Sequence, residues 1–117
     1  MKIKSKINII DYFNRGIKRK SFIGVENEKF LFYENFKYRA NYIQIKKVLN
    51  YLILNFDWSP VKENNNLIGL KQSDKSITLE PGNQIELAGG KLKNIHKVCS
   101  EGNIFLKQLR EACNKIG

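Results

Sequence analysis

The sequence predicts an α+β fold in which helices flank an antiparallel sheet. Three observations lead to this class. Apolar residues recur at helical spacing in two long segments, 41–55 and 91–116. Between these segments, short stretches rich in apolar residues are separated by turn residues, which is typical of hairpins. The chain has 117 residues, enough for one domain with a modest core and small for a complete enzyme.

The first half of the chain contains two helical segments with an extended segment between them. Residues 5–14 are expected to form a short helix that is capped by Ser5 and ends near Gly16. Residues 21–33 are apolar and aromatic and are expected to be extended. Residues 41–55 are expected to form an amphipathic helix, whose apolar positions are Ile45, Val48, Leu49 and Leu52.

The second half is expected to form strands and then a long helix. Residues 63–66 are polar and predict a loop. Residues 67–71 and 76–79 flank a polar stretch and predict a hairpin, and residues 84–87 predict the next strand. Residues 91–116 carry an apolar stripe, which predicts a long helix that packs one face on the sheet.

Two acidic clusters stand out in a chain whose formal net charge is +10. Because strand side chains alternate, Glu26 and Glu28 are expected to project together, and so are Gln84 and Glu86. Glu80 precedes a Pro-Gly turn. A fold that places these segments side by side would gather four carboxylates and an amide on one surface.

Four carboxylates on one surface repel one another unless a cation neutralises them. Mg²⁺ prefers carboxylate and water oxygens and is often shared with nucleotide phosphates, so this surface predicts a site for a metal and a nucleotide. Lys29 and Lys71 lie beside the acidic segments, where they would neutralise phosphate oxygens or simply balance local charge. The alternative is a row of solvated glutamates on the exposed face of an antiparallel sheet.

Motifs along nearly the whole chain carry a resemblance to a known family. The two most specific are the run from Leu79 to Leu87, Leu-Glu-Pro-Gly-x-Gln-x-Glu-Leu, and the run from Ile23 to Phe30, Ile-Gly-x-Glu-x-Glu-Lys-Phe. Further matches are Gly16, Lys18, Tyr42, Gln44-Ile45, Leu49-Asn50, Phe56-Asp57-Trp58, Ile68 to Gln72, Ser76-Ile77, His96, Cys99 and Asn103. Together they resemble the N-terminal part of the plant-type glutamate-cysteine ligases, which also occur in bacteria. The chain departs from the family at Phe22 and Asn27, where the family has arginine and histidine, but no departure removes a carboxylate.

The resemblance implies that residues 1–117 are the N-terminal, incomplete part of a single catalytic domain whose sheet is like that of glutamine synthetase. The implied parent enzyme uses ATP and Mg²⁺ to join the side-chain carboxylate of L-glutamate to L-cysteine, which gives γ-glutamylcysteine for glutathione synthesis. In this scheme Glu26, Glu28, Glu80 and Glu86 are catalytic residues that bind metal or the substrate amine. Gln84, Lys29 and Lys71 would contact the nucleotide or substrate. The isolated segment is expected to be inactive and to need the remainder of the ligase chain.

Two other functions remain open from the sequence. The chain could be a non-catalytic remnant or interaction module that keeps the sheet without the reaction. The second alternative is a basic nucleic-acid-binding module, which the sequence disfavours because its lysines are spread along the chain rather than collected in one stripe. Neither a phosphate-binding loop nor a dinucleotide-binding fingerprint is present in the sequence. With no signal peptide and no long apolar run, we expect a cytoplasmic protein without a membrane partner.

Overall fold

The computed structural model describes residues 3–18, 20–33, 35 and 37–117 and confirms the α+β class. Three helices and seven strands follow one another along the described chain. In order they are α1 (Lys6–Asn14), β1 (Glu26–Lys29), β2 (Phe32–Tyr33), β3 (Tyr38–Arg39), α2 (Tyr42–Asn55), β4 (Ser59–Glu63), β5 (Asn66–Gln72), β6 (Lys75–Glu80), β7 (Gln84–Ala88) and α3 (Ile95–Ile116). None of the helices among the described residues is long and apolar enough to cross a membrane.

Five of the strands form one antiparallel sheet in the order β1-β7-β6-β5-β4, and β2 pairs with β3 in a small hairpin beside it. Strands β4 to β7 follow one another as a meander. Strand β1 is far from β7 in sequence but pairs with it, with Glu28 opposite Glu86. The two acidic segments are therefore neighbours in the sheet.

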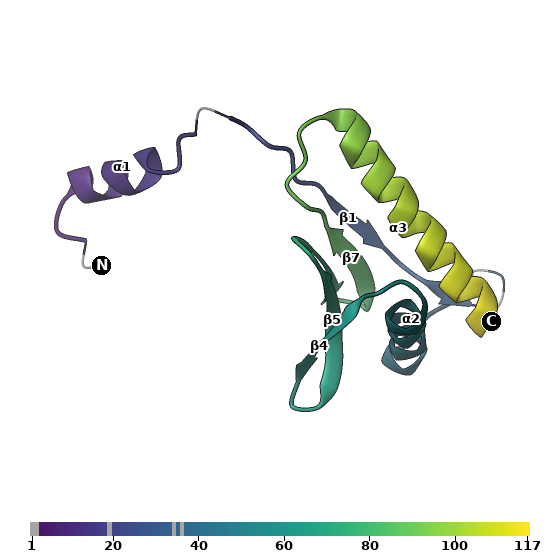
Figure 1. The fold of residues 1–117 in the computed structure, drawn as a ribbon. Coiled ribbons are helices and arrows are strands. Elements are labelled where there is room, and N and C mark those ends of the chain that lie inside the picture. The colour runs from purple at the N-terminus through teal and green to yellow at the C-terminus, as the bar shows by residue number, and fades with distance from the viewer. Residues whose placement is uncertain (1–2, 19, 34, 36) are drawn as a thin grey trace.

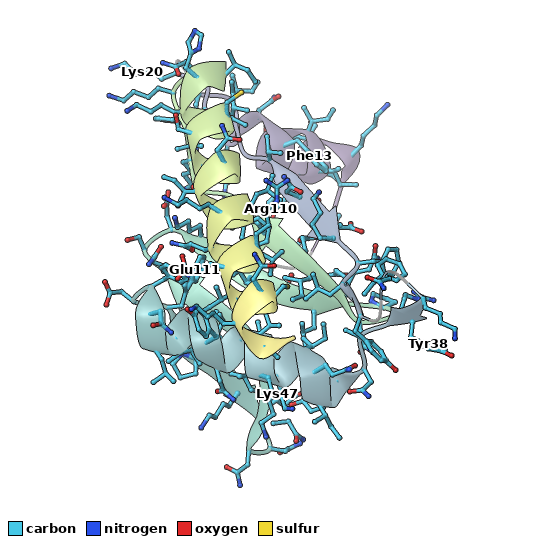
Figure 2. The ribbon with its side chains drawn as sticks, turned by 90° about the vertical axis from the view of Figure 1, so that its right-hand side faces the viewer. Phe13, Lys20, Tyr38, Lys47, Arg110 and Glu111 are labelled. Atoms are coloured by element: carbon cyan, nitrogen blue, oxygen red, sulfur yellow. The ribbon has the colours of Figure 1, made fainter. Side chains whose placement is uncertain are left out.

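Helices α2 and α3 pack on one face of this sheet and close the core. Figure 2 shows α3 crossing α2 in front of the strands. The most deeply buried side chains of the sheet, Leu70, Ile77 and Ile85, meet Ile45, Val48, Leu49 and Leu52 of α2 and Phe105, Leu109 and Ala112 of α3. Hydrogen bonds from Trp58 Nε1 to Gln108 Oε1 (3.0 Å) and from Tyr42 Oη to the Leu67 carbonyl (3.1 Å) tie these layers together. The opposite face of the sheet carries the carboxylates.

The described elements agree with the sequence except at three places, the first of which is β3, a two-residue strand that was not predicted. The loop expected at 63–66 is a two-residue turn, Asn64-Asn65, and both residues have positive φ (46° and 65°). The strand before it, β4, was not predicted, because all five of its side chains are exposed and it shows no buried face. The long helix begins at Ile95 rather than at 91, with Asn94 as its N-cap accepting from Lys97 N (3.0 Å). Leu92 instead pairs with Ile23 as an isolated bridge.

Helix α1 stands apart from the sheet and its helices (Figure 1). It begins after Ser5, whose backbone N–H donates to Asn8 Oδ1 (3.1 Å), and it contains no buried residue. Its apolar side chains are therefore in water, with Ile7 65% and Phe13 72% exposed. The arm extends the molecule to 56 × 35 × 27 Å.

Candidate functional site

The polar face of the sheet is organised in three rows that run across the strands. Paired residues in a sheet share a face, so each row follows from the strand register. The first row contains Glu26, Ala88, Ser76 and Lys71, the second contains Glu28, Glu86, Thr78 and Gly69, and the third contains Gln84 and Glu80. The structure thus brings the four predicted glutamates and Gln84 onto one face.

Glu28 and Glu86 form the closest pair in this arrangement. The backbone N–H of Gly89 donates to the Val25 carbonyl (2.9 Å), so the backbone N–H and C=O groups of Val25 point toward β7. In an antiparallel ladder these groups point toward the partner strand at every second residue, so those of Glu28 point away from β7. Glu28 and Glu86 therefore form a non-hydrogen-bonded pair, whose Cα atoms lie about 4.5 Å apart. This is the geometry in which side chains on one face approach most closely. Two carboxylates placed in this way repel each other when both are ionised.

Glu86 lies at the centre of the second row and is the most affected carboxylate. Only 9% of its surface is exposed, although the face around it is polar. Burial raises the pKa of the Glu86 carboxyl, and the charges of Glu26, Glu80 and Glu28 and a hydrogen bond with Glu28 raise the pKa further. None of the four carboxylates makes an ion pair with another described residue. The site therefore holds negative charge that these parts of the chain leave uncompensated.

Two residues that sequence reasoning did not single out share the carboxylate face. Thr78 lies opposite Glu86 and donates from Oγ1 to Glu80 Oε1 (3.3 Å), which fixes the direction of that carboxylate. Ser76 occupies the corresponding place in the first row. Their signal in the sequence is the alternation of Ser76, Thr78 and Glu80 along β6, two residues apart.

A tight turn joins Glu80 to Gln84 at the end of the third row. Gly82 has a positive φ of 76°, which glycine adopts without strain, and Asn83 follows with a φ of 61°. The guanidinium of Arg39 donates to the Gly82 carbonyl (3.5 Å), and the amide of Asn83 donates to the Ala40 carbonyl (3.4 Å). The β2-β3 hairpin therefore supports the turn that positions Glu80.

The two predicted lysines are placed differently from each other. Lys71 is exposed on the carboxylate face, in the first row and three strands from Glu26, which is about 14 Å across the sheet. Lys29 lies opposite Ile85 and so belongs to the other face, where its ammonium donates to Asn27 Oδ1 and to the Glu28 carbonyl (3.0 Å). The expected place of Lys29 beside the carboxylates was wrong, because Lys29 directly follows Glu28 in β1 and its side chain therefore points to the opposite face of the sheet.

The donor chemistry of the face suits a hard divalent cation, since carboxylate and hydroxyl oxygens are what Mg²⁺ accepts. The side chains do not converge on a single point: among the described residues, no group of three or more His, Cys, Asp or Glu side chains is placed to hold one ion. A cage made by all four glutamates is therefore not formed. The residues fit an ion that takes one or two carboxylates and completes its shell with other oxygens.

The connection from β7 to α3 is clamped by two carboxylates away from these rows. Glu101 of α3 accepts from the Gly90 backbone N–H (3.2 Å), and Asp74 of the β5-β6 turn accepts from the Lys91 N–H (2.9 Å). A Cβ at Gly89 would lie 2.5 Å from Glu101 Oε1 and 2.9 Å from the Val25 carbonyl oxygen. This clamp fixes the end of β7 beside β1.

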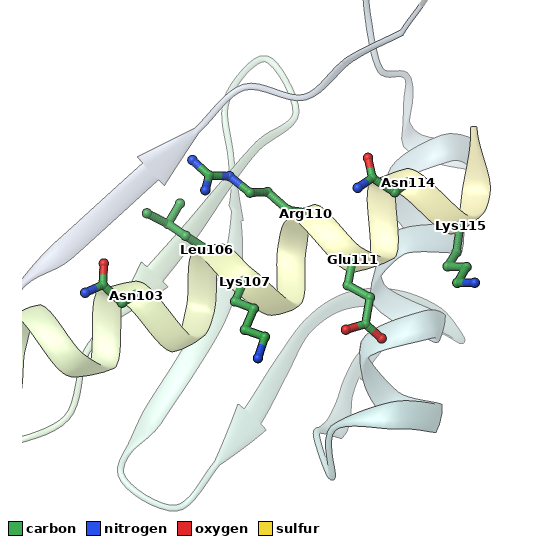
Figure 3. A pocket seen from close by; sticks show the side chains of 7 residues that line it. All are labelled: Asn103, Leu106, Lys107, Arg110, Glu111, Asn114 and Lys115. Carbon is green, nitrogen blue, oxygen red and sulfur yellow. The ribbon is translucent and has the colours of Figure 1, made fainter.

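A concave region lies along the surface of α3 (Figure 3). All of its lining side chains come from this one helix: Asn103, Leu106, Lys107, Arg110, Glu111, Asn114 and Lys115. Glu111 also accepts from Tyr51 Oη of α2 (3.1 Å). A region lined by a single helix is open on its other sides, so it does not enclose a substrate, and the polar face of the sheet remains the candidate site.

Comparison with known proteins gives a consistent set of relatives. The chain is 42% identical over 115 residues to the chloroplastic glutamate-cysteine ligase of Medicago truncatula, which is 97% of this chain and 23% of the relative. It is 41% identical over the same share to chloroplastic glutamate-cysteine ligase A of Oryza sativa subsp. japonica, and 40% identical over 112 residues to the Arabidopsis thaliana ligase, which is 94% of the chain and 22% of the relative. No protein-family model matches the chain. The chain spans about a quarter of the length of these relatives.

The cytoplasmic location expected from the sequence was wrong. The curated relatives are named as chloroplastic proteins. The cytoplasmic expectation rested on the lack of a recognisable signal peptide in the sequence, and this lack does not determine the compartment.

Proposed function

Because the chain resembles the plant-type glutamate-cysteine ligases over almost all of its own length, we propose that it forms part of the catalytic domain of such a ligase. The proposed parent enzyme joins L-glutamate, through its side-chain carboxylate, to L-cysteine at the expense of ATP. The chloroplastic names of the relatives support a plastid location for it. One observation carries the proposal beyond sequence similarity: the pairing of β1 with β7, which places Glu28 against Glu86.

The carboxylate face would bind the cationic partners of this reaction. Mg²⁺, when bound together with nucleotide phosphates, neutralises the charge of the transferring phosphoryl group. Glu26, Glu28, Glu80 and Glu86 are the residues that would hold the metal or the amine of a substrate, each metal ion taking one or two of them. Gln84 would donate its amide to a nucleotide or substrate oxygen, and Lys71 would offer a positive charge at the rim. Lys29 is given no role in binding the nucleotide or substrate, since it lies on the other face of the sheet.

Exposed apolar surface supports a role within a larger unit. The arm formed by α1 presents Ile7, Phe13 and other apolar side chains to water, and near the start of α3 Ile95 is 57% exposed. Large apolar side chains that are exposed together on one helix, as on α1, mark a place that another surface covers. The proposal therefore assigns the 117 residues a supporting and metal-binding role, with the remaining walls of the active site supplied by other parts of the ligase.

A chimera tests the proposal. The matching stretch of the Medicago truncatula ligase is replaced by this chain, and γ-glutamylcysteine formation is measured with ATP, Mg²⁺, L-glutamate and L-cysteine. We expect the chimera to be active, and Glu26→Gln or Glu86→Gln to lower its turnover by about 100-fold or more, as when one preorganised electrostatic group is lost.

The matched control is Glu63→Gln, which removes the same charge from the exposed end of β4, away from the rows. It should leave turnover within a few-fold of the parent chimera. A folded chimera without ligase activity would contradict the proposed function. Glu26→Gln and Glu86→Gln variants with nearly full activity would contradict the assignment of the glutamates.

A further inference from the structure

We propose that Thr78 makes the carboxylate face selective for Mg²⁺ over Ca²⁺, because its hydroxyl holds one oxygen of Glu80 and leaves the other oxygen for a cation. Thr78 is thus a positioning residue that acts through Glu80. This inference rests on the metal-binding part of the proposed function, in which Glu80 is one of the glutamates that hold the metal. It adds the kind of cation that the face prefers and the residue that sets this preference.

The two oxygens of the Glu80 carboxylate are not equivalent. Thr78 and Glu80 lie two residues apart in β6, so their side chains project from the same face of the sheet. The Thr78 hydroxyl donates from Oγ1 to Glu80 Oε1 (3.3 Å). Within the parts of the chain that the structure describes, the other oxygen, Oε2, has no hydrogen-bond or ion-pair partner. One oxygen therefore accepts from a neutral donor, and the other is left for a cation.

The neighbours of Thr78 in the sheet leave Glu80 as the acceptor of its proton. On β5, the residue opposite Thr78 is Gly69, which has no side chain that could accept. On β7, the residue opposite Thr78 is Glu86, which is hydrogen-bonded to Glu28. Threonine is β-branched and has few χ1 rotamers, so its hydroxyl is a stiff donor.

The backbone of Glu80 is restrained as well. Glu80 is the last residue of β6, and the turn that follows it is tied to the β2-β3 hairpin, where Arg39 donates to the Gly82 carbonyl (3.5 Å). The side chain is held by Thr78 and the backbone by the strand and the turn. The direction of the carboxylate is therefore set before a cation arrives.

A carboxylate held by one oxygen suits Mg²⁺ better than Ca²⁺. Mg²⁺ demands a near-ideal octahedron of oxygens, keeps several waters and binds through one or two carboxylates. Ca²⁺ takes about six to eight oxygens in a flexible arrangement and can bind both oxygens of one carboxylate. Because Oε1 of Glu80 accepts from Thr78, binding of Ca²⁺ by both oxygens would require that hydrogen bond to break. Mg²⁺ needs Oε2 alone and leaves the bond intact.

Cation titration of the 117-residue chain tests the inference. Binding of Mg²⁺ and of Ca²⁺ is measured by isothermal titration calorimetry for the parent chain and for Thr78→Val and Thr78→Ser. Thr78→Val keeps the shape of the side chain and removes the hydroxyl, so the ratio of Mg²⁺ affinity to Ca²⁺ affinity should fall by about fivefold, the order of one hydrogen bond. Thr78→Ser keeps the hydroxyl and should retain the parental ratio within about twofold.

Ser76→Ala is the matched control. Ser76 lies in the same strand and on the same face, in the first row, and its hydroxyl is not the one bonded to Glu80. Its loss should leave the ratio within about twofold of the parent. An unchanged ratio in Thr78→Val, or an equal fall in Thr78→Val and Ser76→Ala, would overturn the inference, and so would a parent chain that binds neither cation. If Thr78→Val does not fold, Thr78→Ala, which also lacks the hydroxyl, is read in the same way.

A double variant separates an effect through Glu80 from a merely structural effect. In a Glu80→Gln chain, the further change Thr78→Val should leave the ratio of affinities unchanged, because the hydroxyl no longer restrains a carboxylate. An equal fall with and without the Glu80 carboxylate would show that Thr78 acts by another route and would overturn the positioning role.

The chimera with the Medicago truncatula ligase separates this inference from the proposed function. A folded chimera without ligase activity, whose ratio of affinities still falls with Thr78→Val, would retain the inference and reject the ligase role. An active chimera whose dependence on Mg²⁺ and inhibition by Ca²⁺ are the same with and without the Thr78 hydroxyl would reject the inference alone.

Discussion

At the scale of single residues, the faces of the glutamates and of Lys71 were predictable and the face of Lys29 was not. Alternation along a strand is a fixed property of the backbone, so Glu26 with Glu28 and Gln84 with Glu86 had to share faces once each segment was extended. That β1 and β7 are neighbours required the fold, since 54 or more residues separate them in sequence. Lys29 was misplaced because proximity in sequence was taken for proximity in space. Neighbouring residues of a strand point to opposite faces, so Lys29 and Glu28 lie on different sides of the sheet.

Glu86→Gln is predicted to stabilise the folded chain at pH 7. Burial and the neighbouring Glu26, Glu80 and Glu28 raise the pKa of Glu86 in the folded state above its ordinary value near 4.5. The folded chain therefore binds more protons than the unfolded chain between these two pKa values, and the free energy of unfolding rises as the pH falls through this window. Glutamine is neutral throughout, so the variant gains a few tenths to about 1 kcal/mol at pH 7.

Urea unfolding of the 117-residue chain at several pH values checks this expectation. The variant should unfold at higher urea than the parent at pH 7, and the difference should shrink as the pH approaches 4.5. Glu63→Gln, on the exposed end of β4, provides the comparison for loss of one charge. A Glu86→Gln chain that is less stable than the parent at pH 7 would contradict the predicted repulsion between Glu86 and its neighbouring carboxylates.

At the scale of elements, the helices and the β5-β6 hairpin followed from local patterns, and β3 and β4 did not. Helix α2 has its apolar positions at helical spacing and an Asn41 cap, in which Asn41 and Gln44 exchange hydrogen bonds of 3.1 and 2.8 Å. Both signals are visible in the sequence. Strand β4 is paired on one side only and buries no side chain, so its sequence shows no alternation of apolar and polar residues that would reveal it. The start of α3 was misjudged because Leu92 fits the helical stripe yet pairs with Ile23.

Gly89→Ala is predicted to destabilise the chain by about 2 kcal/mol, within the range of steric changes in buried backbone. The added Cβ would lie 2.9 Å from the Val25 carbonyl oxygen, which belongs to the β1-β7 pairing and cannot move freely. Gly24→Ala is the matched control, because a Cβ there meets nothing within 4 Å. It should be neutral or stabilising. Thermal unfolding of both variants measures the difference, and equal melting temperatures would refute the tight contact.

At the scale of the whole molecule, the chain is more extended than its length requires. Its radius of gyration is 17.9 Å, whereas a compact domain of this length has about 13 Å. Much of the difference lies in the arm that carries α1 (Figure 1). Composition gave no sign of this, because the apolar content of α1 is the same whether its side chains are buried or exposed. Only the arrangement of the elements shows that the arm has no partner within the described chain.

Deletion of residues 1–17 is predicted to leave the free energy of unfolding unchanged within about 0.5 kcal/mol, since α1 buries no residue. The deletion should also reduce the binding of a fluorescent hydrophobic dye, because it removes Ile7, Phe13 and Ile17 from water. Urea unfolding and dye titration measure the two effects. A large loss of stability would mean that α1 packs on the sheet in solution.

The edge position of β1 has a consequence for the acidic face. Strands β1 and β4 each have a neighbour on one side only, so they can fray while β5, β6 and β7 remain fixed. Glu26 and Glu28 therefore lie at a margin of the sheet, whereas Glu80 and Glu86 lie on interior strands. Fraying of β1 would separate Glu28 from Glu86 and relieve the repulsion between them, so a cation bound to this face would hold β1 in the sheet.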